Sequence, residues 1–94
     1  MTRRGFVIRG IVQGVNFRAT AADEARRLGL TGRIWNRADG AVECVVEGDA
    51  ASTDGFRAWL GRGPRSARVE RVEARDLDGD RRYGEFAIAR APAD

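Results

Sequence analysis

The chain has 94 residues, a length typical of one small domain, and we expect residues 1–94 to form a single unit. Its 17 basic residues, all of them arginine, exceed its 14 acidic residues by only three charges. The two signs alternate along much of the sequence, which is typical of a solvated surface and argues against a nucleic-acid-binding stripe.

Composition also excludes several kinds of catalytic site. The chain contains no histidine, which excludes a Ser-His-Asp triad, a Cys–His pair and a histidine metal site. Its single cysteine, Cys44, cannot form an internal disulfide, and it is not followed by the arginine that a cysteine phosphatase loop needs. We expect Cys44 to be a small core residue, and we expect neither a metal nor a cofactor.

The sequence predicts neither a membrane span nor a targeting segment. No stretch reaches the roughly 18 apolar residues of a membrane-spanning helix. No charged-then-apolar leader precedes the first predicted strand. Because a lone cysteine fits a reducing compartment, we expect a cytoplasmic protein that does not bind a membrane.

A strand, a glycine-bearing turn and a helix are predicted for the first third of the chain. Alternating apolar residues predict the strand at 4–10, and an alanine-rich stretch predicts the helix at 17–28, with Ala22, Ala25 and Leu28 facing the sheet. Such a turn can point several backbone N–H groups, and the positive end of the helix dipole, at one anion.

Arg18 supports an anion site at this turn. It lies in the first turn of the predicted helix, where the helix dipole disfavours a cation. An arginine at this position makes sense if an anion lies between its guanidinium and the N–H groups of the turn. A guanidinium can also bind two oxygens of one phosphate, which a lysine cannot do.

A β-hairpin is predicted next. Strands at 31–37 and 41–47 flank the turn residues 38–40. Alternation along the second of these strands directs Val42, Cys44 and Val46 toward the helices. Trp35 should then lie on the opposite, open face of the sheet, where we expect nearby side chains to pack against it.

The second half of the chain predicts a helix and two further strands. Asp49 or Ser52 can cap a helix that ends near Gly61. A strand follows at 67–75, with a bulge expected between Val69 and Val72, and a short last strand at 85–90 should turn Phe86 and Ile88 inward. The order βαββαβ plus a terminal strand predicts an α+β fold, in which two helices cover one face of an antiparallel sheet.

Two motifs resemble the signatures of the acylphosphatase family. Residues 8–18 read Ile-Arg-Gly-Ile-Val-Gln-Gly-Val-Asn-Phe-Arg and differ from the usual pattern at Asn16, where a small residue is more common. Residues 32–42 resemble the second signature, although Arg33 replaces an aromatic residue and Trp35 replaces a longer polar one. The resemblance covers nearly the whole chain and implies a ferredoxin-like fold.

The resemblance also implies roles for particular residues. Arg18 and the backbone N–H groups of the preceding loop would hold the phosphoryl group, and Asn36 would orient the attacking water. The predicted catalytic residues are therefore Arg18 and Asn36. The predicted phosphate-binding loop consists of Gln13, Gly14, Val15, Asn16 and Phe17.

This set of groups suits one class of phosphate compound. An asparagine amide can hold a water molecule but cannot take its proton, and no general acid stands beside it in the predicted site. A leaving alkoxide needs such an acid, whereas a leaving carboxylate, whose parent acid has a pKa of about 4, does not. We therefore expect a monomeric, metal-independent hydrolase that cleaves acyl phosphates to a carboxylate and inorganic phosphate, with phosphate or sulfate as ligands.

Two alternatives remain open at this stage. Residues 82–86, Arg-Tyr-Gly-Glu-Phe, resemble part of an RNA-recognition motif, which would make the chain a nucleic-acid-binding module, although Phe6 is its only aromatic partner on the first strand. The chain could also be a non-catalytic domain that binds acyl or carbamoyl phosphate. We expect a free-standing enzyme that binds no nucleic acid.

Overall fold

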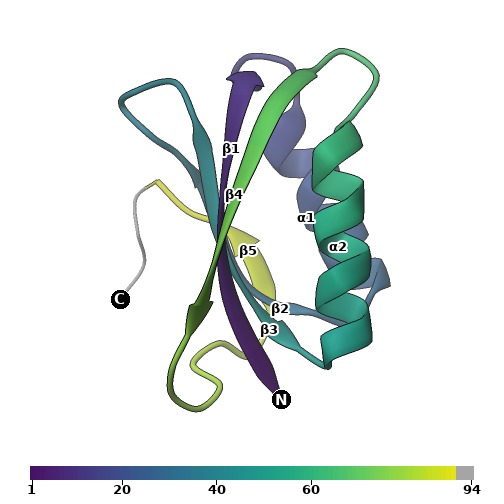
Figure 1. Ribbon diagram of the computed structural model, residues 1–94, viewed down its shortest axis with the longest axis vertical. Coiled ribbons are helices and arrows are strands. Elements are labelled where there is room, and N and C mark those ends of the chain that lie inside the picture. Colours follow the sequence, from purple (N-terminus) through teal and green to yellow (C-terminus); the bar gives the residue numbers. More distant parts are fainter. Residues whose placement is uncertain (91–94) are drawn as a thin grey trace.

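A five-stranded sheet covered on one face by two helices forms the structure, a computed structural model that describes residues 1–90 (Figure 1). The strands lie in the order β4-β1-β3-β2-β5. In chain order the elements are β1 (Thr2–Ile11), α1 (Phe17–Arg27), β2 (Thr31–Asn36), β3 (Val42–Gly48), α2 (Ala50–Arg62), β4 (Arg68–Leu77) and β5 (Phe86–Ile88). The predicted α+β, ferredoxin-like arrangement is confirmed. No helix in this part of the chain is long and apolar enough to cross a membrane.

The last strand differs from the prediction in direction and length. β1, β3, β2 and β4 pair antiparallel, but β5 lies parallel to β2, so the sheet is mixed and not antiparallel throughout. β5 also ends at Ile88, two residues earlier than expected. β4 and β5 lie at opposite edges of the sheet, so the segment between them must cross from one edge to the other before β5 pairs with β2 (Figure 1). This crossing sets the direction in which β5 runs.

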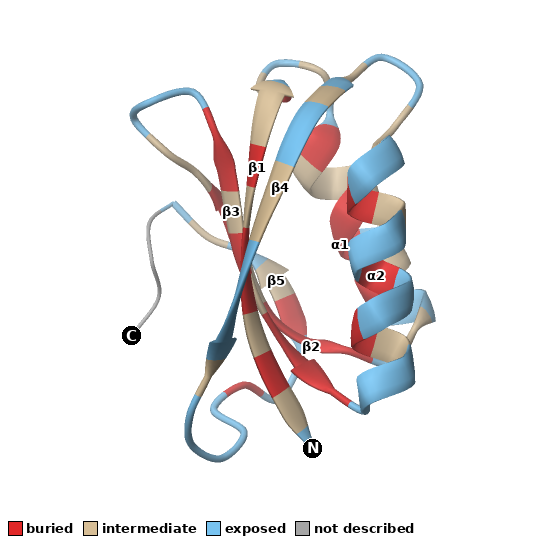
Figure 2. Cartoon of the chain, viewed as in Figure 1, coloured by how far each residue is buried: buried red, intermediate tan, exposed pale blue. Residues whose placement is uncertain are grey.

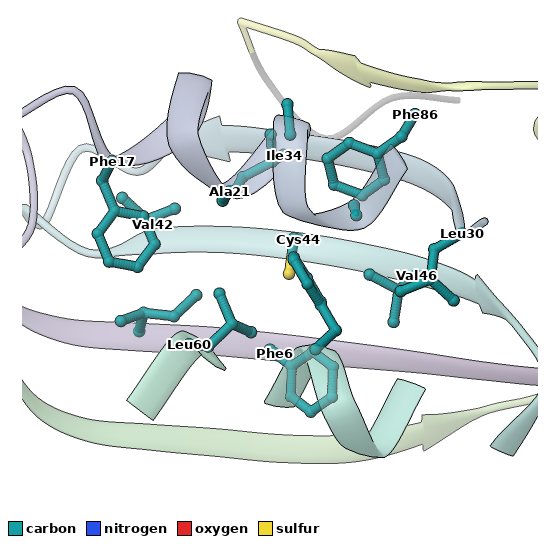
Figure 3. Packing of buried hydrophobic residues seen from close by; sticks show 14 of the residues in the cluster. Phe6, Phe17, Ala21, Leu30, Ile34, Val42, Cys44, Val46, Leu60 and Phe86 are labelled. Atoms are coloured by element: carbon teal, nitrogen blue, oxygen red, sulfur yellow. The ribbon is translucent and has the colours of Figure 1, made fainter. Parts of the chain in front are cut away.

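Buried residues are concentrated between the sheet and the two helices (Figure 2), and their apolar side chains pack together there (Figure 3). Cys44 is fully buried there, as predicted, and burial raises the pKa of its thiol, so Cys44 carries no reactive thiolate. The predicted inward stripe of α1 is confirmed, because Ala22 and Ala25 are buried and Leu28, the half-buried C-cap, packs against the core. The buried residues of α1 are Phe17, Ala21, Ala22 and Ala25.

The predicted bulge between Val69 and Val72 is confirmed. The register of β1 with β4 shifts so that Gly10 pairs with Val69 while Arg9 pairs with Arg71, which leaves Glu70 as the bulged residue. Gly10 has φ +135° and lies so close to β4 that a Cβ would stand 2.1 Å from the Arg68 carbonyl oxygen. A glycine is therefore required opposite the bulge.

The cap of α2 is Asp49, one of the two predicted candidates. Its Oδ1 accepts a hydrogen bond of 2.7 Å from the backbone N–H of Ser52. This bond satisfies one of the N–H groups that the first turn of a helix leaves without a partner.

The open face of the sheet is partly covered by the segment between β4 and β5 (Figure 1). Trp35 lies on this face opposite Glu43 and is only 4% exposed, so nearby side chains do cover it, as expected. Glu47 is fully buried on the same face, where Arg3, Thr31 and the backbone N–H groups of residues 82 and 83 donate to its carboxylate. Burial alone would raise the pKa of Glu47, but these hydrogen bonds outweigh it and hold the pKa below its usual value.

Candidate active site

A cavity opens where the loop after β1, the first turn of α1 and the end of β2 meet. Its volume is about 400 Å³. Of the seven residues that the sequence predicts for the site, five line it. The lining consists of Val12, Gly14, Asn16, Phe17, Arg18, Ala19, Asn36 and Ile88.

Two left-handed residues shape the loop at this cavity. Gly14 has φ +75° and Asn16 has φ +63°, and Asn16 is the one non-glycine residue with positive φ within residues 1–90. Asn16 is also the N-cap of α1, yet its side chain makes no capping hydrogen bond. The first N–H groups of the helix are therefore not satisfied by a cap and can bind an anion.

Arg18 is the cation of this cavity. Its side chain is half-buried and forms no ion pair with any carboxylate in the described part of the chain. Its charge is therefore available to a ligand, in a position where the helix dipole offers it no stabilisation.

Two other arginines near the β2–β3 hairpin share Asp39 as an ion-pair partner, and each also pairs with a glutamate, Arg9 with Glu73 and Arg37 with Glu43. Arg37 Nη2 lies 2.9 Å and Arg9 Nη1 lies 3.3 Å from Asp39 Oδ2. The hydrogen bond from Arg37, with smaller contributions from the Ala41 N–H and Arg9, lowers the pKa of Asp39 to about 2. Arg9 and Arg37 are therefore poorer candidates than Arg18 for binding an anion.

Asn36, the last residue of β2, also lines the cavity. Its Oδ1 is buried and has no hydrogen-bond partner among residues 1–90. Buried polar atoms in proteins are nearly always hydrogen-bonded, so an acceptor without a protein partner at a cavity wall is suited to bind water.

Gln13 and Val15 belong to the loop but do not line the cavity. Gln13 Nε2 donates to the carbonyl oxygens of Arg37, at 2.8 Å, and Ala41, at 2.9 Å. The carbonyl of Val15 accepts a bond of 2.9 Å from the Ser66 hydroxyl. These bonds tie the loop to the β2–β3 hairpin on one side and to the segment before β4 on the other.

Sequence reasoning missed three lining residues and misplaced one of them. Val12 and Ala19 stand next to the motif, so their proximity could have been inferred. Ile88 was expected to face inward beside Phe86, but it is 46% exposed, because it stands at the end of β5 at the edge of the cavity. No local signal in the sequence relates Ile88 to the loop.

Every aromatic residue of the chain is buried or half-buried, and Phe6 lies in the core on the helix side. Residues 1–90 also contain no group of three or more His, Cys, Asp or Glu side chains that could hold a metal ion.

Comparison with known proteins identifies the family. The model of the acylphosphatase family matches residues 4–88. The chain belongs to the acylphosphatase family. It is 46% identical to an acylphosphatase of Mannheimia succiniciproducens over 94% of this chain and 98% of the relative. It is 47% identical to one of Methylococcus capsulatus over 96% of this chain and 98% of the relative.

Solved structures of the same fold agree with this assignment. The acylphosphatase from Bacillus subtilis superposes with a TM-score of 0.91 at 28% identity and covers 95% of this chain and 99% of that one. The full-length protein HypF, in a phosphate- and nucleotide-bound form, is similar over 94% of this chain but only 12% of its own, at 26% identity and a TM-score of 0.86. The chain is an enzyme that hydrolyses acyl phosphates to a carboxylate and inorganic phosphate.

Proposed function

We propose that Arg18 and the backbone N–H groups of residues 13–17 hold the phosphoryl group, and that Asn36 orients the water that attacks it. One observation carries this proposal: Arg18, a cation without an ion pair among residues 1–90, and Asn36, whose buried amide oxygen has no partner among those residues, line the same cavity. The two groups complement the two reactants of hydrolysis, a phosphoryl anion and a water molecule.

The chemistry needs little beyond this arrangement. The N–H groups and Arg18 neutralise charge on the phosphoryl oxygens, which is the main task of a phosphoryl-transfer site. Asn36 Oδ1 accepts a hydrogen bond from water and directs the water oxygen at phosphorus. As the new P–O bond forms, the bond from phosphorus to the acyl oxygen breaks, and its electron pair leaves with the carboxylate.

The proton of the water has one suitable acceptor in this scheme. An amide cannot take it, so it passes to an oxygen of the bound phosphoryl group, which leaves as inorganic phosphate. The departing carboxylate, with a parent-acid pKa of about 4, needs no proton donor. The proposed reaction is therefore independent of metal and cofactor. We also propose that the enzyme is a monomer and that it binds phosphate or sulfate but no nucleic acid.

Arg18 is tested by combining turnover with ligand-induced stabilisation. Inorganic phosphate at about 100 times its dissociation constant should stabilise the wild type by roughly 2.7 kcal/mol, which is several degrees in Tm for a domain of this size. Arg18→Ala should abolish both this shift and the hydrolysis of acetyl phosphate in the presence of a chelator. Arg18→Lys should lose most of both, because an ammonium keeps the charge but cannot bind two oxygens at once.

The matched control for Arg18 is Arg9→Ala, which removes a cation paired with Asp39 and Glu73. This variant should keep the phosphate-induced shift. An undiminished shift in Arg18→Ala would locate the anion elsewhere. Phosphate binding without any turnover in the wild type would favour the non-catalytic alternative.

Asn36 is tested by separating turnover from phosphate affinity. Asn36→Ala should lower kcat about 100-fold or more while the inhibition constant of phosphate stays within about threefold, since its proposed contact is with water. Both constants come from steady-state hydrolysis of acetyl phosphate with phosphate as competitor. If Asn36→Ala weakens phosphate binding and leaves kcat intact, the proposed role is wrong.

A further inference from the structure

Ile88 is an exposed large apolar residue whose position lines the cavity. It is 46% exposed, whereas Ile34, its partner in the parallel register with β2, is fully buried. Single exposed apolar residues are common and need no explanation in themselves. Ile88 differs from Ile11, which is 58% exposed but does not line the cavity, because Ile88 shares the cavity with Arg18 and Asn36.

The exposure of Ile88 does not come from a loosely held strand. After Ile88 in the chain, the N–H of Ala89 donates to the Ile34 carbonyl at 2.8 Å. Before Ile88, the carbonyl of Phe86 accepts two bonds, of 3.0 and 3.2 Å, from the guanidinium of Arg26. β5 is thus held by both β2 and α1, and Ile88 forms a fixed wall.

The cavity lining divides by chemistry. Gly14, Asn16, Arg18 and Asn36 supply polar groups, whereas Val12, Ala19 and Ile88 supply aliphatic surface. Among residues 1–90, Arg18 is the single charged residue in the lining, and none of the lining residues is acidic. In the proposed function Arg18 binds the phosphoryl group of the substrate. The acyl group of the same substrate then has only the uncharged residues of this lining left to contact.

We propose that Ile88 and Ala19 form a subsite for the acyl group and that this subsite selects uncharged, apolar acyl phosphates over those with a second carboxylate. An apolar acyl group loses water-exposed surface against Ile88, which favours its binding. A second carboxylate placed there would lose hydration without a second cation among the described lining residues to compensate for it, which disfavours its binding. The proposal rests on the proposed function only for the location of the phosphoryl group.

The test uses two rigid substrates of similar shape, 4-methylbenzoyl phosphate and 4-carboxybenzoyl phosphate, with acetyl phosphate as the short reference. The wild type should prefer the methyl over the carboxyl substrate by about 10-fold or more in kcat/KM. Ile88→Ala should reduce kcat/KM for 4-methylbenzoyl phosphate severalfold relative to acetyl phosphate. Ile88→Lys should reverse the preference toward the carboxyl substrate, because it places a cation at the subsite.

Ile11→Lys is the matched control, since it introduces the same charge at the exposed isoleucine outside the cavity. It should leave the ratio between the two aromatic substrates within about twofold of the wild type. The subsite is refuted if Ile88→Lys and Ile11→Lys change this ratio equally, or if Ile88→Ala lowers kcat/KM for all three substrates by one factor. A failure of the proposed function appears separately, as retained turnover in Arg18→Ala or Asn36→Ala.

Discussion

At the scale of single residues, backbone conformation decides what the loop can bind. Asn16 holds φ +63° without a capping bond from its side chain. A residue with a Cβ costs roughly 1–2 kcal/mol in this left-handed conformation, from which glycine is exempt and which asparagine tolerates better than most. This explains how Asn16 fits a position where the family more often has a small residue.

The conformation of Asn16 gives a prediction with an internal control. Asn16→Ala should lower the free energy of unfolding by about 1 kcal/mol, because alanine has the Cβ penalty without the local hydrogen bonding of asparagine. Asn16→Gly should be close to the wild type. Urea unfolding in phosphate-free buffer measures both. Equal stabilities of the glycine and alanine variants would mean that this residue is not left-handed in solution.

At the scale of elements, the proposed active site depends on how the β1–α1 loop is fixed to the β2–β3 hairpin. Gln13 makes this connection through two hydrogen bonds from one amide nitrogen. Asn36 immediately precedes Arg37, whose carbonyl accepts one of these bonds. Gln13 therefore sets the separation between the proposed phosphoryl-binding loop and the proposed water-binding residue.

Gln13→Met, which keeps the length of the side chain but removes the donor, should lower kcat about 10-fold or more. A misplacement of about 1 Å can cost roughly 100-fold in rate. The inhibition constant of phosphate should change little, because the loop still contains its own N–H groups. Ser66→Ala serves as the control, since it removes a loop bond that does not involve the hairpin. Equal losses of kcat in the two variants would show that the hairpin bond has no special role.

At the scale of the whole molecule, Glu47 connects distant parts of the chain. Its carboxylate accepts bonds from Arg3 at the start of β1, Thr31 at the start of β2 and the segment that leads to β5. Removing one partner of a buried ion pair usually costs about 3 kcal/mol or more, because the other charge is left without compensation. Glu47→Gln should therefore be strongly destabilised at pH 7.

The pH dependence of this loss has a definite sign. The pKa of Glu47 is lower in the folded chain than its ordinary value of 4.5, so its contribution is complete above that value and disappears as pH falls through the folded pKa. The difference in unfolding free energy between wild type and Glu47→Gln should narrow as pH falls below 4.5 toward the folded pKa. Glu73→Gln, at a half-exposed carboxylate paired with Arg9, should lose much less at pH 7. A constant difference across this range would contradict the lowered pKa.

The sequence by itself determined those features that depend on neighbouring residues. The spacing of apolar residues indicated the order of strands and helices, and residue types indicated the glycine-bearing turn after the first strand and a helix cap at Asp49 or Ser52. Arg18 in the first turn of a helix indicated an anion site before any family was considered. Each of these signals is local, because it comes from side-chain periodicity, capping or the dipole of one helix.

Tertiary structure alone decided the features that join distant segments. The parallel direction of β5 depends on where the chain returns to the sheet, and so does the position of Ile88 at the cavity edge. The burial of Glu47 needs hydrogen-bond donors from residues 3 and 82. The ion pair of Arg9 needs Asp39, which lies in the turn between β2 and β3. No periodicity in the sequence encodes such partners, because they lie dozens of residues apart and meet only when the sheet is complete.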